Sequence, residues 1–173
     1  MKLKEKILIA AKETISIEAK AIANLENFID SEFAEAVEKI YKAKGRVIVT
    51  GIGKSAVIAT KIVATLNSTG TPAIFMHAAD AIHGDLGTIQ KDDVVICISK
   101  SGNSPEIKVL VPYIKDFNNL LIGITADKES FLGRESDYIL NSYVEKEACP
   151  NNLAPTTSTT AQMVMGDALA ICL

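Results

Sequence analysis

Five short apolar runs, rich in valine and isoleucine, constrain the fold of this chain more than any other feature. We expect strands at 46–50, 73–77, 93–98, 120–125 and 138–142. The runs lack polar alternation, which favours a parallel sheet covered on both faces. Between them lie helical patterns at 54–68, 104–117 and 130–135, and a short helical turn at 79–86. This alternation implies right-handed crossovers, and it predicts an α/β fold: a three-layer αβα sandwich around a five-stranded parallel sheet.

The N-terminal part has a helical pattern instead of strands. Apolar residues recur at helical spacing through residues 3–28, and Asp30 and Ser31 then interrupt the pattern and cap a second helix. The first helix has more hydrophobic positions than one small sheet needs to cover itself, so we predict at least a dimer with helix contacts between subunits. The chain is thus expected to be one domain over 1–173, with N-terminal helices at 1–44 and an α/β core at 45–173.

The last segment repeats apolar residues from Ala161 to Cys172 on one helical face. It stops at Leu173 with no glycine or basic residue to end a helix. We therefore expect the natural chain to continue beyond Leu173.

Composition and charge exclude several classes of protein. The 173 residues, 48% of them apolar and 23% charged, suit one domain with a real core. The net charge of −3 argues against nucleic-acid binding. The sequence shows neither a membrane-length apolar run nor a signal-peptide cleavage pattern. Three scattered cysteines (Cys97, Cys149 and Cys172) indicate reduced thiols and a cytoplasmic protein.

A serine-rich turn follows the third strand. The segment from Ser99 to Glu106 reads Ser-Lys-Ser-Gly-Asn-Ser-Pro-Glu, and a helical pattern follows it. Ser104 suits the N-cap of that helix and Pro105 its first position. A helix N-terminus favours an anion, and three serine hydroxyls add donors. The turn is thus either a phosphate site or a well-capped helix start.

Other polar residues collect in the loops that follow the remaining strands, where ligands bind in parallel sheets. The glycine turn Gly51–Ser55 is not a Walker A loop of a nucleoside triphosphatase, because Ile48 stands where that loop needs its first glycine. It meets a dinucleotide fingerprint only formally, since the required acidic residue is missing at the end of the next strand. What remains is a tight turn that presents Lys54 and Ser55, where Lys54 suits an oxyanion or substrate oxygens.

Two histidines and a carboxylate are further candidates. His77 and His83 do not form a recognisable zinc motif. His83 precedes a polar turn in which an imidazole can act as acid or base. Glu147 follows the fifth strand, where it is either a surface charge or a site residue. The run Thr156–Thr160 has more hydroxyls than a helix cap requires.

Together these residues resemble the sugar isomerase (SIS) domain family, and within it the bacterial D-arabinose 5-phosphate isomerases. The resemblance runs from about Gly45 to the end of the chain. The serine turn marks any SIS domain, whereas the other motifs are narrower. The matching motifs are Gly-Ile-Gly-Lys-Ser at 51–55, Ser-Thr-Gly-Thr-Pro at 68–72, His-Gly-Asp-Leu-Gly at 83–87, Lys-Glu-Ala-Cys-Pro at 146–150 and Leu-Ala-Pro-Thr-Thr-Ser-Thr-Thr at 153–160.

The resemblance implies an aldose–ketose isomerase, an intramolecular oxidoreductase that interconverts D-ribulose 5-phosphate and D-arabinose 5-phosphate on the pathway to the lipopolysaccharide octulosonic acid. It implies homodimers or homotetramers with shared active sites, no nucleic-acid or membrane partner, and no required cofactor, with possible zinc at His77. The residues matched as catalytic are Lys54, Glu106, Glu147 and His83. The residues matched to substrate are Gly53, Ser55, Gly70, Thr71, His83, Ser99, Ser101, Gly102, Asn103, Ser104 and Thr157.

The chemistry needs a base near C1 and C2 and acid–base help for ring opening. Glu106 and Glu147 are the candidate carbon bases; Glu106 is preferred, and His83 suits ring opening. The family also carries a catalytic histidine in a His-Pro-Gly-Gly-like segment and, in many members, a pair of cystathionine-β-synthase-type regulatory domains, which this sequence does not include. Two alternatives remain: a regulatory SIS module that binds a sugar phosphate without turnover, and an isomerase for another sugar phosphate.

Overall fold

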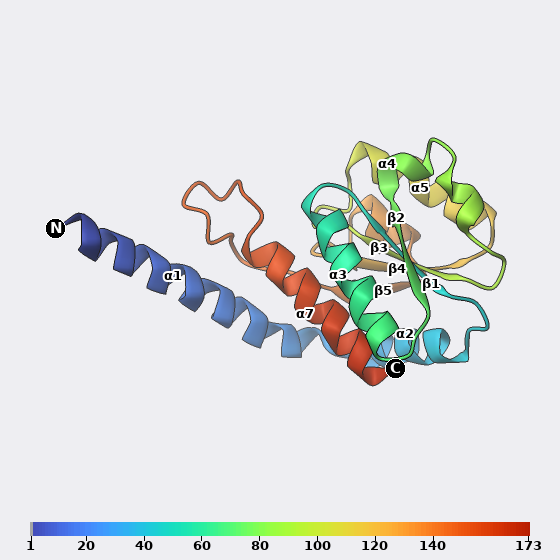
Figure 1. The fold of residues 1–173 in the computed structure, drawn as a ribbon, viewed down its shortest axis with the longest axis horizontal. Coiled ribbons are helices and arrows are strands. Elements are labelled where there is room, and N and C mark those ends of the chain that lie inside the picture. Colours follow the sequence, from blue (N-terminus) through green and yellow to red (C-terminus); the bar gives the residue numbers. More distant parts are fainter. Residues whose placement is uncertain (1) are drawn as a thin grey trace.

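The computed structural model describes residues 2–173 and contains the expected parallel sheet within that range (Figure 1). The strand order is β2-β1-β3-β4-β5, and every neighbouring pair is parallel. The strands are β1 (Val47–Gly51), β2 (Ala73–His77), β3 (Val94–Ile98), β4 (Leu120–Thr125) and β5 (Tyr138–Asn141). The predicted α/β sandwich is confirmed.

The helices alternate with the strands as the sequence pattern predicts. The expected turn at 79–86 is two short elements, α4 and η2, because Gly84 at φ +138° interrupts it. The helical elements are α1 (Leu3–Asn24), η1 (Leu25–Phe28), α2 (Ser31–Lys42), α3 (Lys54–Ser68), α4 (Ala78–Ala81), η2 (Asp85–Thr88), α5 (Pro105–Asp116), α6 (Phe131–Glu135) and α7 (Thr157–Cys172).

Alternate strand residues supply two separate cores. Val47 and Val49 point to the face covered by α2, α3 and α7, whereas Ile48 points to the face covered by α4, α5 and α6. Because side chains alternate along a strand, each apolar strand serves both layers. The strands therefore lack polar alternation because helices cover both faces of the sheet, so that neither face is exposed to water.

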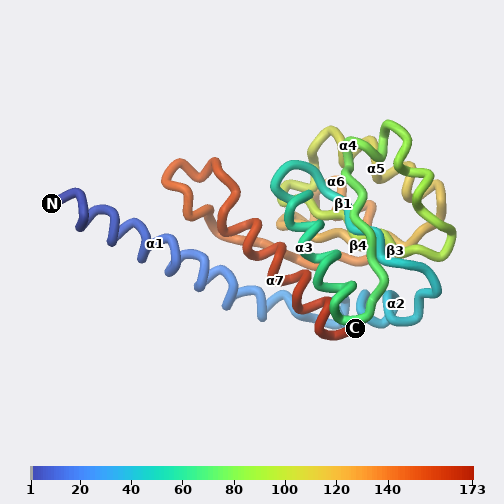
Figure 2. The backbone as a smooth tube through the Cα atoms, in the orientation of Figure 1, coloured from blue at the N-terminus to red at the C-terminus, as the bar shows by residue number. Residues whose placement is uncertain are grey.

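The first helix leaves the sandwich. Within residues 2–173, α1 has no buried residue, and Leu3 and Ile15 are 73% and 69% exposed. Figures 1 and 2 show α1 extending away from the sheet, on the same side as the loop between β5 and α7. At its C-terminal end the chain turns into α2, whose N-cap Asp30 accepts a hydrogen bond from the Phe33 N–H at 3.1 Å, as predicted.

The described part of the chain, from Lys2 onward, contains no helix long and apolar enough to cross a membrane.

Candidate functional site

The strand order places a topological switch point between β1 and β3, and the region of the loops that follow these strands is called the crevice below. The chain turns to one side from β1 to β2, and to the other side from β3 onward. Ligands bind at such a switch point, outside the carboxyl ends of the strands. The register aligns Gly51, the end of β1, with His77 of β2 and Ile98 of β3. The loops that follow these three residues therefore begin side by side.

The turn between β1 and α3 is built on Gly53. This residue has φ +58°, a conformation that favours glycine, and it is the N-cap of α3. Lys54 is the first residue of α3 and is exposed. The Ser55 hydroxyl donates to the Gln162 side-chain oxygen at 3.2 Å and so joins α3 to α7. The structure thus places Lys54 at the crevice, whereas Ser55 is engaged by α7.

The serine turn after β3 is held by its own hydroxyls. The Ser99 hydroxyl accepts from the Gly102 N–H at 3.1 Å, and the Ser101 hydroxyl accepts from the Asn103 N–H at 3.3 Å. Gly102 has φ +61°, and a Cβ there would lie 2.0 Å from the Ser130 hydroxyl oxygen. The turn is therefore pre-organised against the loop after β4. Both serine hydroxyls keep a proton that can be donated to a ligand.

The Ser104 hydroxyl has no hydrogen-bond partner in the described chain. Ser104 is the N-cap of α5, as predicted, and Pro105 follows at the first helical position. Its hydroxyl makes no capping bond, and its buried Oγ has no hydrogen-bond partner among residues 2–173. Buried polar atoms are normally satisfied, so this hydroxyl is one of the few in the described chain that a bound group could satisfy. Beside the N-terminus of α5, an anion fits this position.

Glu147 lies in the loop between β5 and α7, where its side chain contacts the N-terminus of α7, and it is almost completely buried, at 3% exposure. Its Oε2 accepts from the Thr156 N–H at 2.8 Å, the Thr156 hydroxyl at 3.2 Å and the Ser158 N–H at 3.1 Å. Its Oε1 accepts from the Lys100 ammonium at 2.6 Å. The surface-charge interpretation of Glu147 is thus wrong: the carboxylate occupies the anion position at the N-terminus of α7.

These contacts set the ionisation of Glu147. Burial alone would raise its pKa, but the hydrogen bonds from Lys100 and from the first turn of α7 outweigh burial and lower the pKa to about 2. A carboxylate with so low a pKa is a weak base at neutral pH.

Lys100 is the residue that the sequence reasoning missed. It lies between Ser99 and Ser101 in the turn, and its side chain is 44% exposed, whereas that of Glu147 is 1% exposed. The sequence did contain one signal for Lys100: it is a positively charged residue within a turn that was predicted to bind an anion. Its partner is 47 residues away in the chain, so local sequence does not reveal the pair.

Glu106 differs from Glu147 in its surroundings. It is the second residue of α5 and half-buried, beside the serine turn. The structure brings it to the same edge of the sheet as Lys54 and Lys100, because α3 and α5 both begin there.

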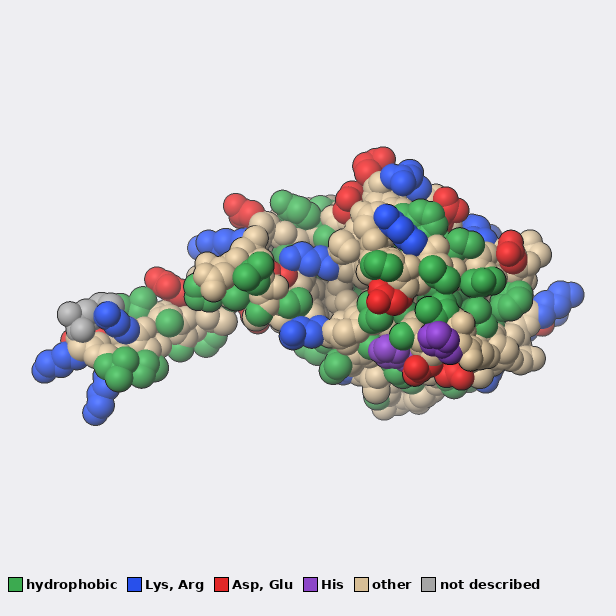
Figure 3. Space-filling view, turned by 90° about the horizontal axis from the view of Figure 1, so that it is seen from above, with side chains coloured by type: hydrophobic (Ala, Val, Ile, Leu, Met, Phe, Trp, Pro, Cys, Tyr) green, Lys and Arg blue, Asp and Glu red, His purple; other side chains and the backbone are tan. Residues whose placement is uncertain are grey.

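The histidines occupy the neighbouring loop. His77 ends β2, and its Nδ1 lies 3.9 Å from an Asp80 carboxylate oxygen; His83 is exposed after α4. Figure 3 shows both histidines (purple) close together on one face, beside acidic side chains. Across Lys2–Leu173, no group of three or more His, Cys, Asp or Glu residues is arranged to hold a metal ion.

Besides Ser55, three residues matched to substrate lie away from the crevice or are engaged within the chain. Gly70 and Thr71 precede β2, at the opposite edge of the sheet, and a five-residue strand advances roughly 16 Å. Their contact with substrate stays a prediction. Thr157 is buried, and its hydroxyl accepts from the Ala148 N–H at 3.0 Å. The threonine run therefore mainly holds the loop of Glu147.

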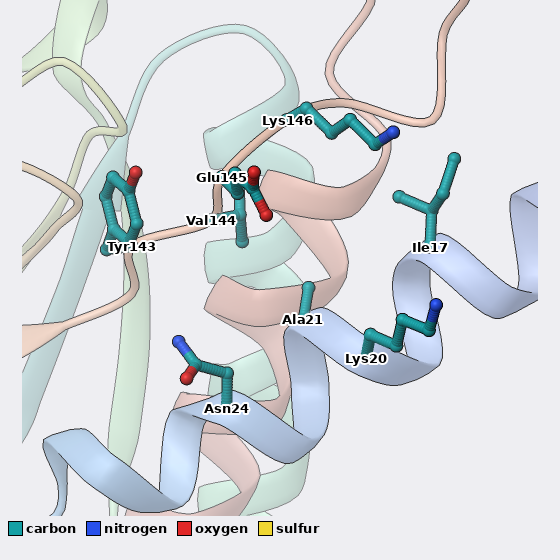
Figure 4. Close-up of a pocket in the computed structure, with 8 residues that line it drawn as sticks. All are labelled: Ile17, Lys20, Ala21, Asn24, Tyr143, Val144, Glu145 and Lys146. Carbon is teal, nitrogen blue, oxygen red and sulfur yellow. The ribbon is translucent and has the colours of Figure 1, made fainter.

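A groove of about 660 Å³ lies between α1 and the loop after β5 (Figure 4). None of the residues matched to substrate or catalysis lines it. It is lined by Ile17, Lys20, Ala21 and Asn24 of α1 and by Tyr143, Val144, Glu145 and Lys146. A second groove of about 510 Å³ continues along α1 and includes Glu147 and Cys149.

Fold and site together define a doubly wound α/β domain with a serine-rich turn at its switch point. The chain belongs to the SIS domain family, whose model matches residues 39–172.

Sequence relatives and solved structures agree with this family. The arabinose 5-phosphate isomerase KdsD of Francisella tularensis is 52% identical over 94% of this chain and 51% of its own length. The protein of the same name from Escherichia coli K12 is 50% identical over 95% of this chain and 50% of its own length. The chain thus spans about half the length of the curated relatives it matches. The structure of E. coli CFT073 c3406 in complex with arabinose 5-phosphate matches with a TM-score of 0.93 and 40% identity, over 99% of this chain and 90% of that one.

Proposed function

We propose that this chain is the catalytic domain of an aldose–ketose isomerase that interconverts D-ribulose 5-phosphate and D-arabinose 5-phosphate. The observation that carries the proposal is the pre-organised serine turn, in which the buried Ser104 hydroxyl lacks a partner among residues 2–173, beside Glu106 and Lys54. The relatives named arabinose 5-phosphate isomerase and the c3406 complex with arabinose 5-phosphate support this choice of sugar phosphate.

The substrate phosphate binds at the serine turn. The hydroxyls of Ser101 and Ser104 and the N-terminal amides of α5 donate to its oxygens. The phosphate anchors the sugar, so that binding energy remote from the reaction holds C1 and C2 in place. Lys54, at the start of α3, faces the same crevice and stabilises the negative charge of the enediolate oxygens.

Glu106 is the base that takes the proton from carbon. Its half-buried position leaves it accessible to a ligand, whereas the oxygens of Glu147 are engaged by Lys100 and α7. Glu106 takes the proton from C1 of the ketose to give an enediolate, and its conjugate acid returns that proton to C2. The hydroxyl proton of O1 passes to O2 in the same conversion, so that C1 becomes the carbonyl carbon. His83 provides acid–base help in opening the sugar ring.

We propose no required cofactor. A zinc ion at His77 would need ligands from another subunit, since one chain does not bring three suitable groups together within residues 2–173, and no step of the mechanism depends on it.

The assembly is a homodimer or homotetramer with shared active sites. The exposed apolar residues of α1, such as Ile7 and Ile15, are available for a second copy. A neighbouring subunit would also give Gly70 and Thr71 a role at the site. The reaction is placed in the cytoplasm, in keeping with three cysteines that are free in the described chain, and in the supply of the lipopolysaccharide octulosonic acid.

The test is incubation with ribulose 5-phosphate and analysis of the product. Arabinose 5-phosphate is expected from the wild type, and Glu106→Gln should lower turnover by about 10²- to 10⁴-fold because the amide cannot take a proton. Ser101→Ala with Ser104→Ala should weaken binding of the sugar phosphate without unfolding the protein.

Ser68→Ala is the matched control, since this exposed serine lies at the other end of α3. Wild-type deuterium incorporation at C2 in Glu106→Gln would remove Glu106 as the carbon base. Unchanged affinity in the double serine variant would remove the phosphate assignment.

A further inference from the structure

The ion pair between Lys100 and Glu147 joins two loops that are 47 residues apart. Lys100 belongs to the serine turn, and its backbone oxygen accepts from the Ala126 N–H at 3.1 Å and from the Thr125 hydroxyl at 3.3 Å. Glu147 is fixed by the first turn of α7. Both ends of the pair are thus anchored to the sandwich, so the ammonium of Lys100 is held at a defined place.

Glu147 has no free oxygen for a substrate. One oxygen accepts from Lys100 and the other accepts three hydrogen bonds, and the side chain is 1% exposed. To take a proton from a sugar carbon, the carboxylate would have to leave all four donors. Its contacts fit the orientation of a cation better than they fit proton transfer from carbon.

Lys100 has the opposite character. Its side chain is 44% exposed, and its ammonium has three donors, of which Glu147 uses one. The residue directly precedes Ser101, which the proposed function assigns to the substrate phosphate. The two remaining N–H donors of this ammonium can bind an anionic oxygen of a ligand.

We propose that Lys100 is a substrate-binding cation of this site, and that Glu147 is a positioning residue that acts through Lys100 rather than as the carbon base. The ligand group is an anionic oxygen of the sugar phosphate, either on the phosphate or on the reacting carbons. This inference rests on the proposed function, because it uses the same substrate at the same turn.

The test compares Lys100→Gln, Glu147→Gln and the double variant with the wild type. Lys100→Gln removes the charge but keeps a donor for Glu147, which protects the fold. Glu147→Gln sets an amide N–H against a donor whichever way it is turned, because both carboxylate oxygens accept. Each single variant should lower kcat/KM by about 10- to 100-fold, the usual loss for a charge-assisted hydrogen bond.

The kcat/KM of the double variant should be no lower than that of the poorer single variant, because both changes disrupt the same ion pair. Lys100→Arg should recover part of the activity.

The acid limb of the pH profile should remain in Glu147→Gln, since Glu106 is the base. A rise in KM would place the phosphate at Lys100, and a fall in kcat alone would place the reacting oxygen there. Lys115→Gln is the control, because its pair with Asp137 at 2.7 Å lies at the opposite edge of the sheet.

Two results would overturn the inference. One is wild-type kcat and KM in Lys100→Gln. The other is a further loss of tenfold or more when Glu147→Gln is added to Lys100→Gln, which would give Glu147 a role of its own. Calorimetric titration with arabinose 5-phosphate needs no turnover, and Lys100→Gln should weaken this binding at least tenfold if the phosphate is the group bound. Absent isomerisation by the wild type would instead count against the proposed function.

Discussion

Acid unfolding should reveal how strongly the fold holds the Glu147 carboxylate. The pKa of this group falls from 4.5 to about 2 in the folded chain. A folded pKa below the unfolded one stabilises the protein above pH 4.5, and this stabilisation is lost as the pH falls through the folded value near 2. The shift corresponds to about 3 kcal/mol at neutral pH, at about 1.4 kcal/mol per tenfold change in proton affinity.

The perturbation is Glu147→Gln, and the assay is urea unfolding at a series of pH values from 6 to 3. Glutamine does not titrate, so the wild type should lose stability relative to the variant by about 2 kcal/mol over this range. The comparison isolates one group because the other carboxylates are common to both proteins.

The exposed Glu38, which pairs with Lys42 along α2, provides the control. Glu38→Gln should follow the wild type closely at every pH, because solvent screens an exposed pair. A constant gap between wild type and Glu147→Gln from pH 6 to pH 3 would refute the reasoning, since it would mean that folding does not lower the pKa of Glu147.

Three further outcomes are expected. Gly102→Ala should lower the free energy of unfolding by about 2–4 kcal/mol, from positive φ and the clash with Ser130; urea unfolding checks this, and a loss below 1 kcal/mol would contradict it. Asp93→Asn should cost about 2–3 kcal/mol, because this buried carboxylate accepts from the Arg46 N–H at 2.7 Å and its guanidinium at 2.9 Å; an unchanged urea midpoint would exclude it. Ile15→Glu on α1 should shift the protein toward a monomer in sedimentation velocity, and an unchanged distribution would remove α1 from the interface.

Local sequence was sufficient to predict the elements of this fold. Valine and isoleucine runs predicted the strands, because an apolar strand is stable only between two covered layers. Short-range chemistry also identified Asp30 as a cap and Ser104 and Pro105 as the start of α5, since a cap concerns residues three or four apart. The gathering of polar loops at one edge followed from the parallel sheet alone.

Contacts between distant segments needed the tertiary structure. The pair of Lys100 and Glu147 depends on which strands are neighbours and on where α7 begins, and neither is encoded within a local window. The location of Gly70 and Thr71 also needed the tertiary structure. Motif matching assigned both residues to substrate, and within one chain the length of β2 separates them from the crevice. Sequence by itself determined which segments are strands and helices and which turn suits an anion. Only the tertiary structure decided which charges meet, because burial and strand order set the partners of a buried carboxylate.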